Sequence, residues 1–387
     1  MYTRSALRAC ALFLALVLCA AVAACSRAPE PVTFGMEKRH YDRLKLKARP
    51  EVWEDGMRTS LDPGLFEWWY VDAHLDDGSV VVIVFYTRPM VGIDSPAVPI
   101  VTVSLTDPDG TRHGMALKAP PSYFRASRDR CDVAIGDSRI TGDLKNYRIV
   151  VNMKAFSCDL ALKGRVPAWR PATGYGFYGR EEEKYFAWLC AVPVGEISGS
   201  MEFQGNRRTV RGSGYHDHNW GNVELNGILN DWWWTRAQIG GYTVITSEMM
   251  TTKRYGNVTM PVFLLARGND ILLEDGRNMT LERSGAFMHP VSGKIVENHL
   301  VFTYRDAGKK QLVRYTLDRT KDILVFDMLR AFPAWKAALA RLVGVRPWYH
   351  RILGDAGLYV EMDGKKENLR STTVYELMFL GDNIRRR

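Results

Sequence analysis

Apolar and polar residues alternate along most of the chain in short runs, a pattern typical of half-buried β-strands. Residues 67–75 and 80–86 are two such runs, and the turn residues Asp76-Asp77-Gly78-Ser79 between them predict a β-hairpin. Similar runs continue toward the C-terminus, at 101–105, 147–153, 185–192, 198–203, 242–249, 262–266, 271–274, 300–304, 312–317, 358–362 and 374–380. Short strands at this spacing, with Gly- and Asp-containing turns, predict an all-β protein built from antiparallel barrels or sandwiches.

One segment departs from this pattern. Residues 322–353 contain stretches of helical periodicity, with Pro333 near their start and Pro347 near their end. The apolar residues that fall near one face of such a helix are Phe332, Trp335, Leu339 and Leu342. We favour a short helical insertion that caps or plugs a barrel end, and the alternative is a basic amphipathic helix that contacts a membrane surface.

The N-terminal residues have the composition of an export signal. Arg4 and Arg8 precede an apolar stretch at 12–22, which ends in small residues and is too short to span a bilayer comfortably. The cysteine that follows the small residues resembles the lipobox of bacterial lipoproteins. We therefore expect a signal peptide at 1–24 and a lipid on Cys25, and Ser26 resembles the pattern of lipoproteins that are sent to an outer membrane. The expected location is the cell envelope, facing the periplasm.

Length and charge limit the domain organisation and the kinds of partner that we expect. We expect a tether at 25–54, a first β-domain at 55–228 and a second at 229–387, in a monomeric protein. The formal net charge is +9, but no run of Lys and Arg is interleaved with aromatic residues, so we expect no nucleic-acid partner. A basic surface near anionic lipid headgroups is the simpler interpretation.

The internal cysteines do not fix a disulfide. An exported protein permits one, and Cys131 and Cys158 both fall in strand-like segments, so the sequence leaves a Cys131–Cys158 bond open. Cys190 has the apolar neighbours of a small core residue, and the spacing of the cysteines is not that of a zinc ribbon.

The most distinctive run is Gly212-Ser213-Gly214-Tyr215-His216-Asp217-His218-Asn219-Trp220-Gly221, and the Trp-rich strand 231–237 follows it. Together with Glu67-Trp68-Trp69-Tyr70, it resembles the EWWY and GxGYHDxNWG motifs of the lipocalin-like superfamily of carotenoid 1,2-hydratases and AttH-type proteins. The resemblance implies two calycin-like antiparallel β-domains around a deep apolar pocket. It also implies polyene- or terpenoid-like ligands and, for some members, hydration or cyclisation without a cofactor.

The strand period separates the residues of this motif. In an extended segment His216, His218 and Trp220 share one face, while Asp217 and Asn219 share the other. Two histidines on one face could begin a metal site, but the pattern identifies no third ligand. We therefore expect neither a metal nor another cofactor.

Hydration of an isolated double bond needs a proton donor, a stabilised carbocation and a positioned water. A buried carboxyl group can serve as the donor, so Asp217 and Glu248 are candidate acids, and His218 is a candidate to orient the acid or the water. The other residues that we expect at the pocket are Glu67, Trp69, Tyr215, Trp220, Trp233, Arg236 and Tyr242. Among these, Glu67 is a candidate ion-pair partner of Arg236 at the pocket wall.

The resemblance is incomplete at one place. Carotenoid hydratases have a His-x-Trp pair, which His218-Asn219-Trp220 matches, and a later Tyr-x-Asp pair, where this chain has Ile245-Thr246-Ser247-Glu248. An alternative interpretation of the motif is structural: its glycines would allow a tight crossover, and its polar residues would satisfy buried backbone groups. The sequence thus favours a membrane-anchored protein that binds an apolar isoprenoid- or polyene-like ligand, either as a hydratase or cyclase or as a non-catalytic lipid carrier.

Overall fold

The computed structural model describes residues 28–381 except 90–91, 307, 332–333 and 343. The signal peptide expected at 1–24 and the lipidated Cys25 lie outside the described residues. None of the helices described is long and apolar enough to cross a membrane.

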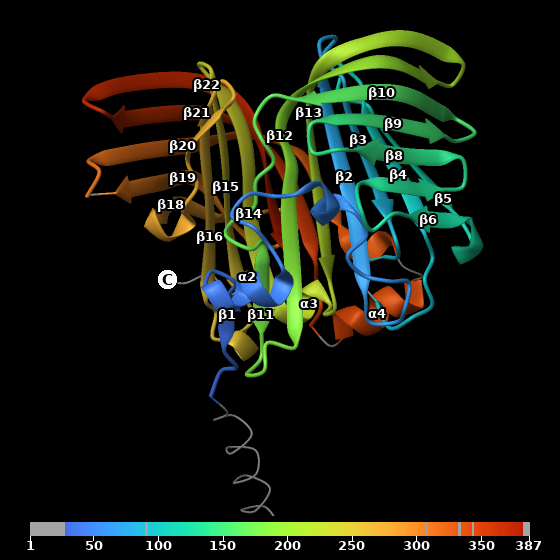
Figure 1. Cartoon of the computed structure of the whole chain (residues 1–387), viewed down its shortest axis with the longest axis horizontal. Coiled ribbons are helices and arrows are strands. Elements are labelled where there is room, and N and C mark those ends of the chain that lie inside the picture. The colour runs from blue at the N-terminus through green and yellow to red at the C-terminus, as the bar shows by residue number, and fades with distance from the viewer. Residues whose placement is uncertain (1–27, 90–91, 307, 332–333, 343, 382–387) are drawn as a thin grey trace, which may run out of the picture.

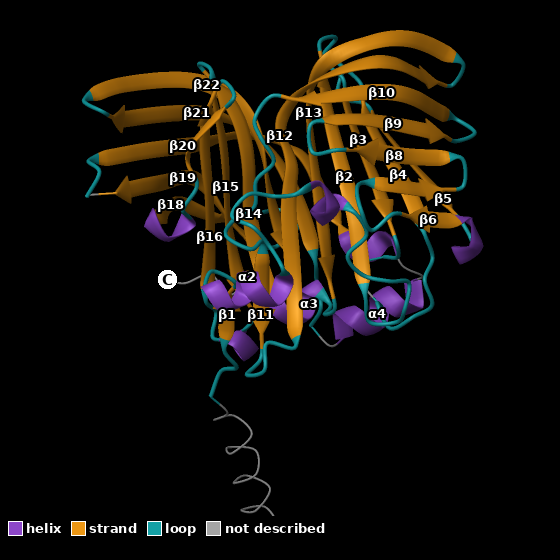
Figure 2. Cartoon of the chain, viewed as in Figure 1, coloured by secondary structure: helices purple, strands orange, loops and turns teal. Residues whose placement is uncertain are grey.

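Two antiparallel sheets make up most of the molecule, which confirms the predicted all-β class (Figure 2). The 13-stranded first sheet has the main strand order β5 (Arg112–Lys118), β4 (Ile100–Thr106), β3 (Val80–Tyr86), β2 (Phe66–Leu75), β13 (Asn206–Gly221), β12 (Lys184–Phe203), β10 (Phe156–Gly164), β9 (Asn146–Asn152), β8 (Ser138–Gly142), β7 (Asp132–Ile135) and β6 (Phe124–Ala126). Two further strands extend it beside β12: β11 (Tyr175–Tyr178), and β1 (Val32–Phe34) next to it.

The nine-stranded second sheet is formed by the C-terminal part of the chain. Its order is β17 (Asp270–Leu273), β16 (Thr259–Arg267), β15 (Tyr242–Thr251), β14 (Leu229–Ile239), β22 (Lys365–Phe379), β21 (Trp348–Met362), β20 (Gln311–Asp327), β19 (Ile295–Asp306) and β18 (Met279–Met288). The helices are short: α2 (Lys38–Leu44), α3 (Leu225–Ile228) and α4 (Ala334–Leu342), with 3₁₀ turns at Val52–Asp55, Pro121–Tyr123, Lys253–Tyr255, Gly276–Asn278 and Met328–Ala331. Figure 1 shows the two curved sheets side by side, with β12, β13 and β2 facing β14 and β15.

Each sheet covers an apolar core of its own, and a third apolar layer lies between the sheets. The core of the first sheet includes Trp69 and Trp220, and that of the second includes Trp233. The layer between the sheets consists of Trp169, Cys190, Tyr215, Ile245, Val262 and Leu264. Because side chains alternate along a strand, β13 sends Trp220 to its own core and Tyr215 to the shared layer, and β15 sends Val244 and Ile245 to the two sides in the same way.

The structure contradicts one interpretation of the glycines in the motif. We considered a tight crossover there, but residues 212–221 lie within β13, near the centre of the first sheet. A Cβ atom on Gly212 would lie 2.1 Å from the carbonyl oxygen of His74 on β2, and one on Gly221 would lie 2.7 Å from the carbonyl oxygen of Tyr185. These glycines allow neighbouring strands to approach, rather than allowing the chain to change direction.

The helical prediction for 322–353 is only partly correct. Strand β20 continues to Asp327 and β21 begins at Trp348, and the two pair with each other. Among the residues described in this segment, only 334–342 forms an α-helix. Trp335, Leu339 and Leu342 are 67%, 56% and 82% exposed, so α4 does not bury the apolar face expected of a barrel cap. Phe332 lies outside the described residues.

The structure also answers the question about the cysteines. Cys131, Cys158 and Cys190 are all buried and free, so the bond between Cys131 and Cys158 that the sequence left open is not formed.

Candidate functional site

Strand β13 sends the residues of the motif to two different places, as the alternation predicted. It pairs with β2 so that His218 lies opposite Trp69, and Trp220 lies opposite Glu67, all on the inner face of the first sheet. Asp217 points the other way, toward the second sheet, where Tyr215 belongs to the shared apolar layer. Asp217 and His218 are therefore on opposite sides of one strand and cannot act on the same atom.

The inner group is a buried hydrogen-bond network. Nε2 of His218 lies 2.7 Å from Oε1 of Glu67. Glu67 also accepts hydrogen bonds from the backbone N–H groups of Arg58 and Thr59 and from the Thr59 hydroxyl. The ring of Trp69 stacks on His218, with centroids 4.6 Å apart. This network satisfies Glu67 completely, so the ion pair that we considered between Glu67 and Arg236 is not formed.

Asp55 belongs to the same group, and the sequence analysis did not identify it. It lies at the end of the 3₁₀ turn Val52–Asp55, where Tyr147 donates a 2.5 Å hydrogen bond to it and Nε2 of His216 lies 3.2 Å from it. The indole N–H of Trp69 donates to the backbone carbonyl of Asp55. Nothing in the local pattern around Asp55 indicated burial, because its partners are far away in the sequence.

The Asp217 carboxyl group lies in the layer between the sheets. It accepts hydrogen bonds from the Tyr215 hydroxyl at 2.7 Å, the Trp188 indole N–H at 3.1 Å and the Asn219 amide at 2.8 Å. Burial raises the pKa of Asp217 to about 6, against the lowering effect of the hydrogen bonds from Tyr215 and Trp188. A carboxyl group with this pKa exists in both protonation states near neutral pH.

Aromatic rings surround this carboxyl group. Trp188 is in edge contact with Trp169, with centroids 5.5 Å apart, and Tyr215 is in edge contact with Trp234 at the same distance. Tyr70 makes a third edge contact, with Tyr215. Aromatic rings thus make up much of the surroundings of Asp217, while His216 and Asp72 act on it electrostatically.

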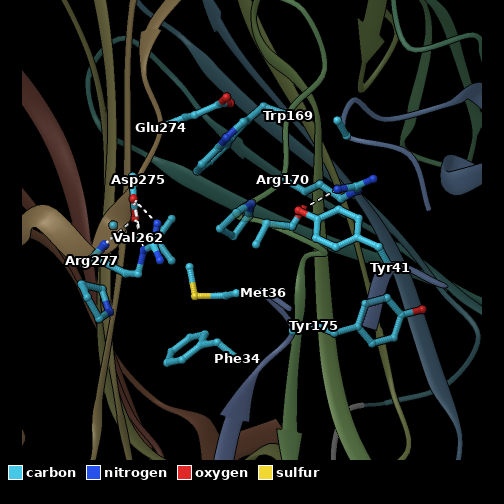
Figure 3. A pocket seen from close by; sticks show the side chains of 16 residues that line it. Phe34, Met36, Tyr41, Trp169, Arg170, Tyr175, Val262, Glu274, Asp275 and Arg277 are labelled. Carbon is cyan, nitrogen blue, oxygen red and sulfur yellow. Dashed lines mark hydrogen bonds and ion pairs between the residues drawn. The ribbon is translucent and has the colours of Figure 1, made fainter. Parts of the chain in front are cut away.

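Two hollows reach this aromatic layer from different sides. The first has a volume of about 290 Å³ and is shown in Figure 3. Phe34, Met36, Trp169 and Val262 give it apolar walls. Asp275 and Arg277 add an ion pair on the side of the second sheet. Trp169 lines this hollow and contacts Trp188, whose indole N–H donates to Asp217, so the hollow is connected to Asp217 through these two side chains.

The second hollow, of about 310 Å³, has several charged residues in its lining. Asp72, Trp234, Arg236, Arg351 and Glu376 line it. Arg236 forms an ion pair with Asp72, and its guanidinium carbon lies 5.0 Å from the centroid of the Tyr215 ring. Burial raises the pKa of Glu376 in the same wall. Tyr215, which is hydrogen-bonded to Asp217, therefore lies directly behind this charged lining.

Comparisons with known proteins decide the family. The family model described as AttH-like matches residues 63–314. The chain belongs to the AttH-like family. Among curated proteins it is similar to the acyclic carotenoid 1,2-hydratases of Rubrivivax gelatinosus (24% identical over 209 residues, 50% of each chain) and Thiocapsa roseopersicina (25% over 208 residues, 51% of this chain and 50% of that one). The chain spans about half the length of these curated relatives.

Solved structures resemble this AttH-like chain over most of its length. A putative AttH from Nitrosomonas europaea has a TM-score of 0.57 at 16% identity, covering 86% of this chain and 97% of that one. Kievitone hydratase from Nectria haematococca has a TM-score of 0.53 at 12% identity, covering 91% and 97%. At these identities the likeness shows the fold alone, and it confirms the predicted lipocalin-type architecture.

The predicted site residues of this AttH-like protein occupy three separate regions. Asp217, Tyr215 and Arg236 lie between the sheets, whereas Glu67, Trp69, His218 and Trp220 lie inside the first sheet. Trp233, Tyr242 and Glu248 lie inside the second sheet, where Glu248 forms an ion pair with Arg283. The structure does not bring Asp217, His218 and Glu248 together, because neighbouring residues of a strand face opposite ways.

Proposed function

We propose that this protein is an acid–base enzyme of the hydratase type, which binds an apolar, unsaturated ligand between its two sheets. The observation that carries the proposal is the position of Asp217, a buried carboxyl group surrounded by aromatic rings and held by Tyr215, Trp188 and Asn219. The hydratase relatives support the reaction class.

The chemistry follows from this position. Asp217 would donate a proton to one carbon of the double bond, and the carbocation that results would lie against the faces of Trp188 or Trp234. A water molecule would add to the cation and return a proton to the Asp217 carboxylate. The Tyr215 hydroxyl, 2.7 Å from Asp217, would hold the carboxyl group in place during both steps. His218 has no part in this scheme, because it lies on the other face of β13.

The test uses the natively purified protein and a lipid extract of its host membrane in ¹⁸O-labelled water. We expect mass spectrometry to detect a lipid that gains one labelled water with the wild-type protein. Asp217→Asn should still bind that lipid but fail to convert it. The matched control is Glu248→Gln, which removes the other candidate acid, and it should convert the lipid like the wild type.

Either of two results would contradict the proposed enzyme activity. If Asp217→Asn converts as fast as the wild type, Asp217 is not the donor. If the wild-type protein retains a lipid in the aromatic layer and never changes its mass, the protein is a carrier, the function that the apolar walls of the first hollow would equally support.

We further propose that the protein works at the membrane of the cell envelope, anchored by a lipid on Cys25. Figure 1 shows the chain leaving β1 toward its N-terminus at the same end of the molecule as α4. A lipid-borne substrate would then dissolve in the bilayer to which the protein is attached.

A further inference from the structure

A set of metal-binding side chains converges inside the first sheet, on the face of β13 opposite to Asp217. Asp55, Cys131 and His216 each offer one ligand atom, and these atoms lie within 4.8 Å of one another. His218 lies next to this group of three, with its Nδ1 3.4 Å from Oδ1 of Asp55. All four residues are at most 1% exposed. They come from the 3₁₀ turn Val52–Asp55, the residue before β7, and β13.

Hydrogen bonds fix the orientation of both imidazoles. Nδ1 of His216 lies 2.8 Å from the carbonyl oxygen of Tyr70, and a carbonyl only accepts, so Nδ1 carries a proton and Nε2 points at Asp55. Nε2 of His218 lies 2.7 Å from Glu67, which leaves Nδ1 toward Asp55. A histidine whose outer nitrogen is held by a carbonyl or carboxylate, while its inner nitrogen faces a shared point, is typical of metal ligands.

Two buried atoms in this group, Oδ1 of Asp55 and Nδ1 of His218, lie 3.4 Å apart without a well-formed hydrogen bond among the residues that the structure describes. An unsatisfied buried polar atom costs about 1–3 kcal/mol, so fully buried atoms of this kind call for an explanation. A cation between them would ligate both.

We propose that Asp55, Cys131, His216 and His218 bind a structural zinc ion. Zinc favours four ligands of the nitrogen, sulfur and oxygen types in a tetrahedron, at about 2.0–2.3 Å, which puts neighbouring ligand atoms about 3.3–3.7 Å apart. Nε2 of His216 lies 3.2 Å from Oδ2 of Asp55, and Nδ1 of His218 lies 3.4 Å from Oδ1 of the same carboxylate, so both separations are close to that range. Four protein ligands in a fully buried place leave no open position for a substrate, so the role is structural.

The ion would fasten the segment before β2 to the interior of the first sheet. On the other side of the same 3₁₀ turn, Glu54 forms a buried ion pair with Arg170, 2.6 Å from Oε2 to Nε. Zinc at Asp55 would complete this attachment. The sequence led us to expect no metal, because Asp55 and Cys131 are remote from β13 in the chain and only the two histidines could be placed together.

The first experiment measures metal in the full mature chain. The protein is purified without chelators under reducing conditions, and we expect about one equivalent of zinc, which Co²⁺ can replace with a thiolate-to-cobalt absorption band. Cys131→Ser should abolish that band. Cys158→Ser is the matched control, because Cys158 is a buried free thiol of the same core, and it should leave zinc content and the band unchanged. Absence of bound zinc after incubation of the refolded protein with Zn²⁺ would overturn the proposal, as would an equal effect of the two cysteine variants.

The second experiment tests the oriented imidazole without removing a ligand. Glu67→Gln keeps the shape of the Glu67 side chain but weakens its hold on His218, so the zinc affinity measured by chelator competition should fall about 10–100-fold. An unchanged affinity would contradict the assignment of His218. The outcome is independent of the proposed enzyme, because Asp217→Asn should retain full zinc content whether or not it converts a ligand.

Discussion

Gly212 occupies a point in the molecule where two strands leave no room for a side chain. A Cβ atom there would lie 2.1 Å from the carbonyl oxygen of His74 and 2.8 Å from Cα of Leu75, both in β2. Backbone atoms cannot move aside like the end of a flexible side chain. The approach matters because β2 and β13 together carry Glu67, Trp69, His216 and His218.

We predict that Gly212→Ala destabilises the protein by about 1–3 kcal/mol, the usual cost of forcing extra atoms into a packed interior. Denaturant unfolding followed by Trp fluorescence measures the change. Gly114→Ala is the control, because Gly114 lies in the exposed part of β5 and a Cβ there would have no neighbour within 4 Å. Its effect should stay within about 0.5 kcal/mol. Equal losses in the two variants would show that close packing at Gly212 is not the cause.

For single residues, the sequence predicted which face of a strand each side chain points to, but not which distant residues it contacts. The alternation of β13 correctly placed His216, His218 and Trp220 on one face and Asp217 and Asn219 on the other. The same alternation places Trp233 and Trp234 on opposite faces of their strand. We had not applied it there, so residues from three regions were combined into one expected site. Asp55 could not be found at all, because its contact with His216 spans 161 positions and depends on the closed sheet.

Among the helices and strands, α2 is attached to the rest of the protein through one acidic residue outside it. Arg39, His40 and Arg43 of α2 all contact the carboxylate of Glu182, which lies between β11 and β12. The Glu182 side chain is only 9% exposed, whereas those of Arg39 and Arg43 are about half exposed. Burial would raise the pKa of Glu182, but hydrogen bonds from Arg39 and His40 outweigh it and hold the pKa below its ordinary value of 4.5.

We predict that Glu182→Gln lowers the free energy of unfolding at pH 7 by on the order of 1 kcal/mol, since ion pairs with exposed partners contribute little. A carboxyl group with a lowered folded-state pKa stabilises the protein above its unfolded pKa and loses this effect as the pH falls through the folded-state pKa. The difference between wild type and variant should therefore shrink on acidification below 4.5. Unfolding titrations across that range test this, with the exposed neighbour Glu181→Gln as control. A difference that persists at the acid end would exclude the ionised carboxylate as its source.

How well an element could be predicted depended on whether its signal was local. The hairpin expected at 67–75 and 80–86 is β2 and β3, because a long alternating run and its turn are encoded in adjacent residues. The short strands β7 (four residues) and β8 (five) were missed, since so few positions show no clear period. Residues 322–327 and 348–353 were assigned to a helical segment because their pairing between β20 and β21 is a tertiary contact.

For the molecule as a whole, the exposed face of α4 is the feature that supports the proposed membrane location. Trp335, Leu339 and Leu342 are each more than half exposed, and Figure 1 places α4 at the same end of the molecule as the start of β1. In the anchored protein that we propose, this apolar helix face, together with the formal charge of +9 of the full sequence, would suit insertion among anionic headgroups.

We predict that α4 binds membranes without help from the lipid anchor. A mature chain carrying Cys25→Ala, which cannot be acylated there, should bind vesicles of phosphatidylethanolamine and phosphatidylglycerol in a flotation assay. Replacing Trp335, Leu339 and Leu342 together by Ser should weaken this binding about tenfold or more, because each apolar side chain that leaves water contributes on the order of 1 kcal/mol. Tyr123→Ser removes a residue that is 62% exposed in the 3₁₀ turn Pro121–Tyr123, outside α4, and should bind like the parent. If the triple variant binds as tightly as the parent, α4 does not face the membrane, and the anchor alone would have to hold the protein there.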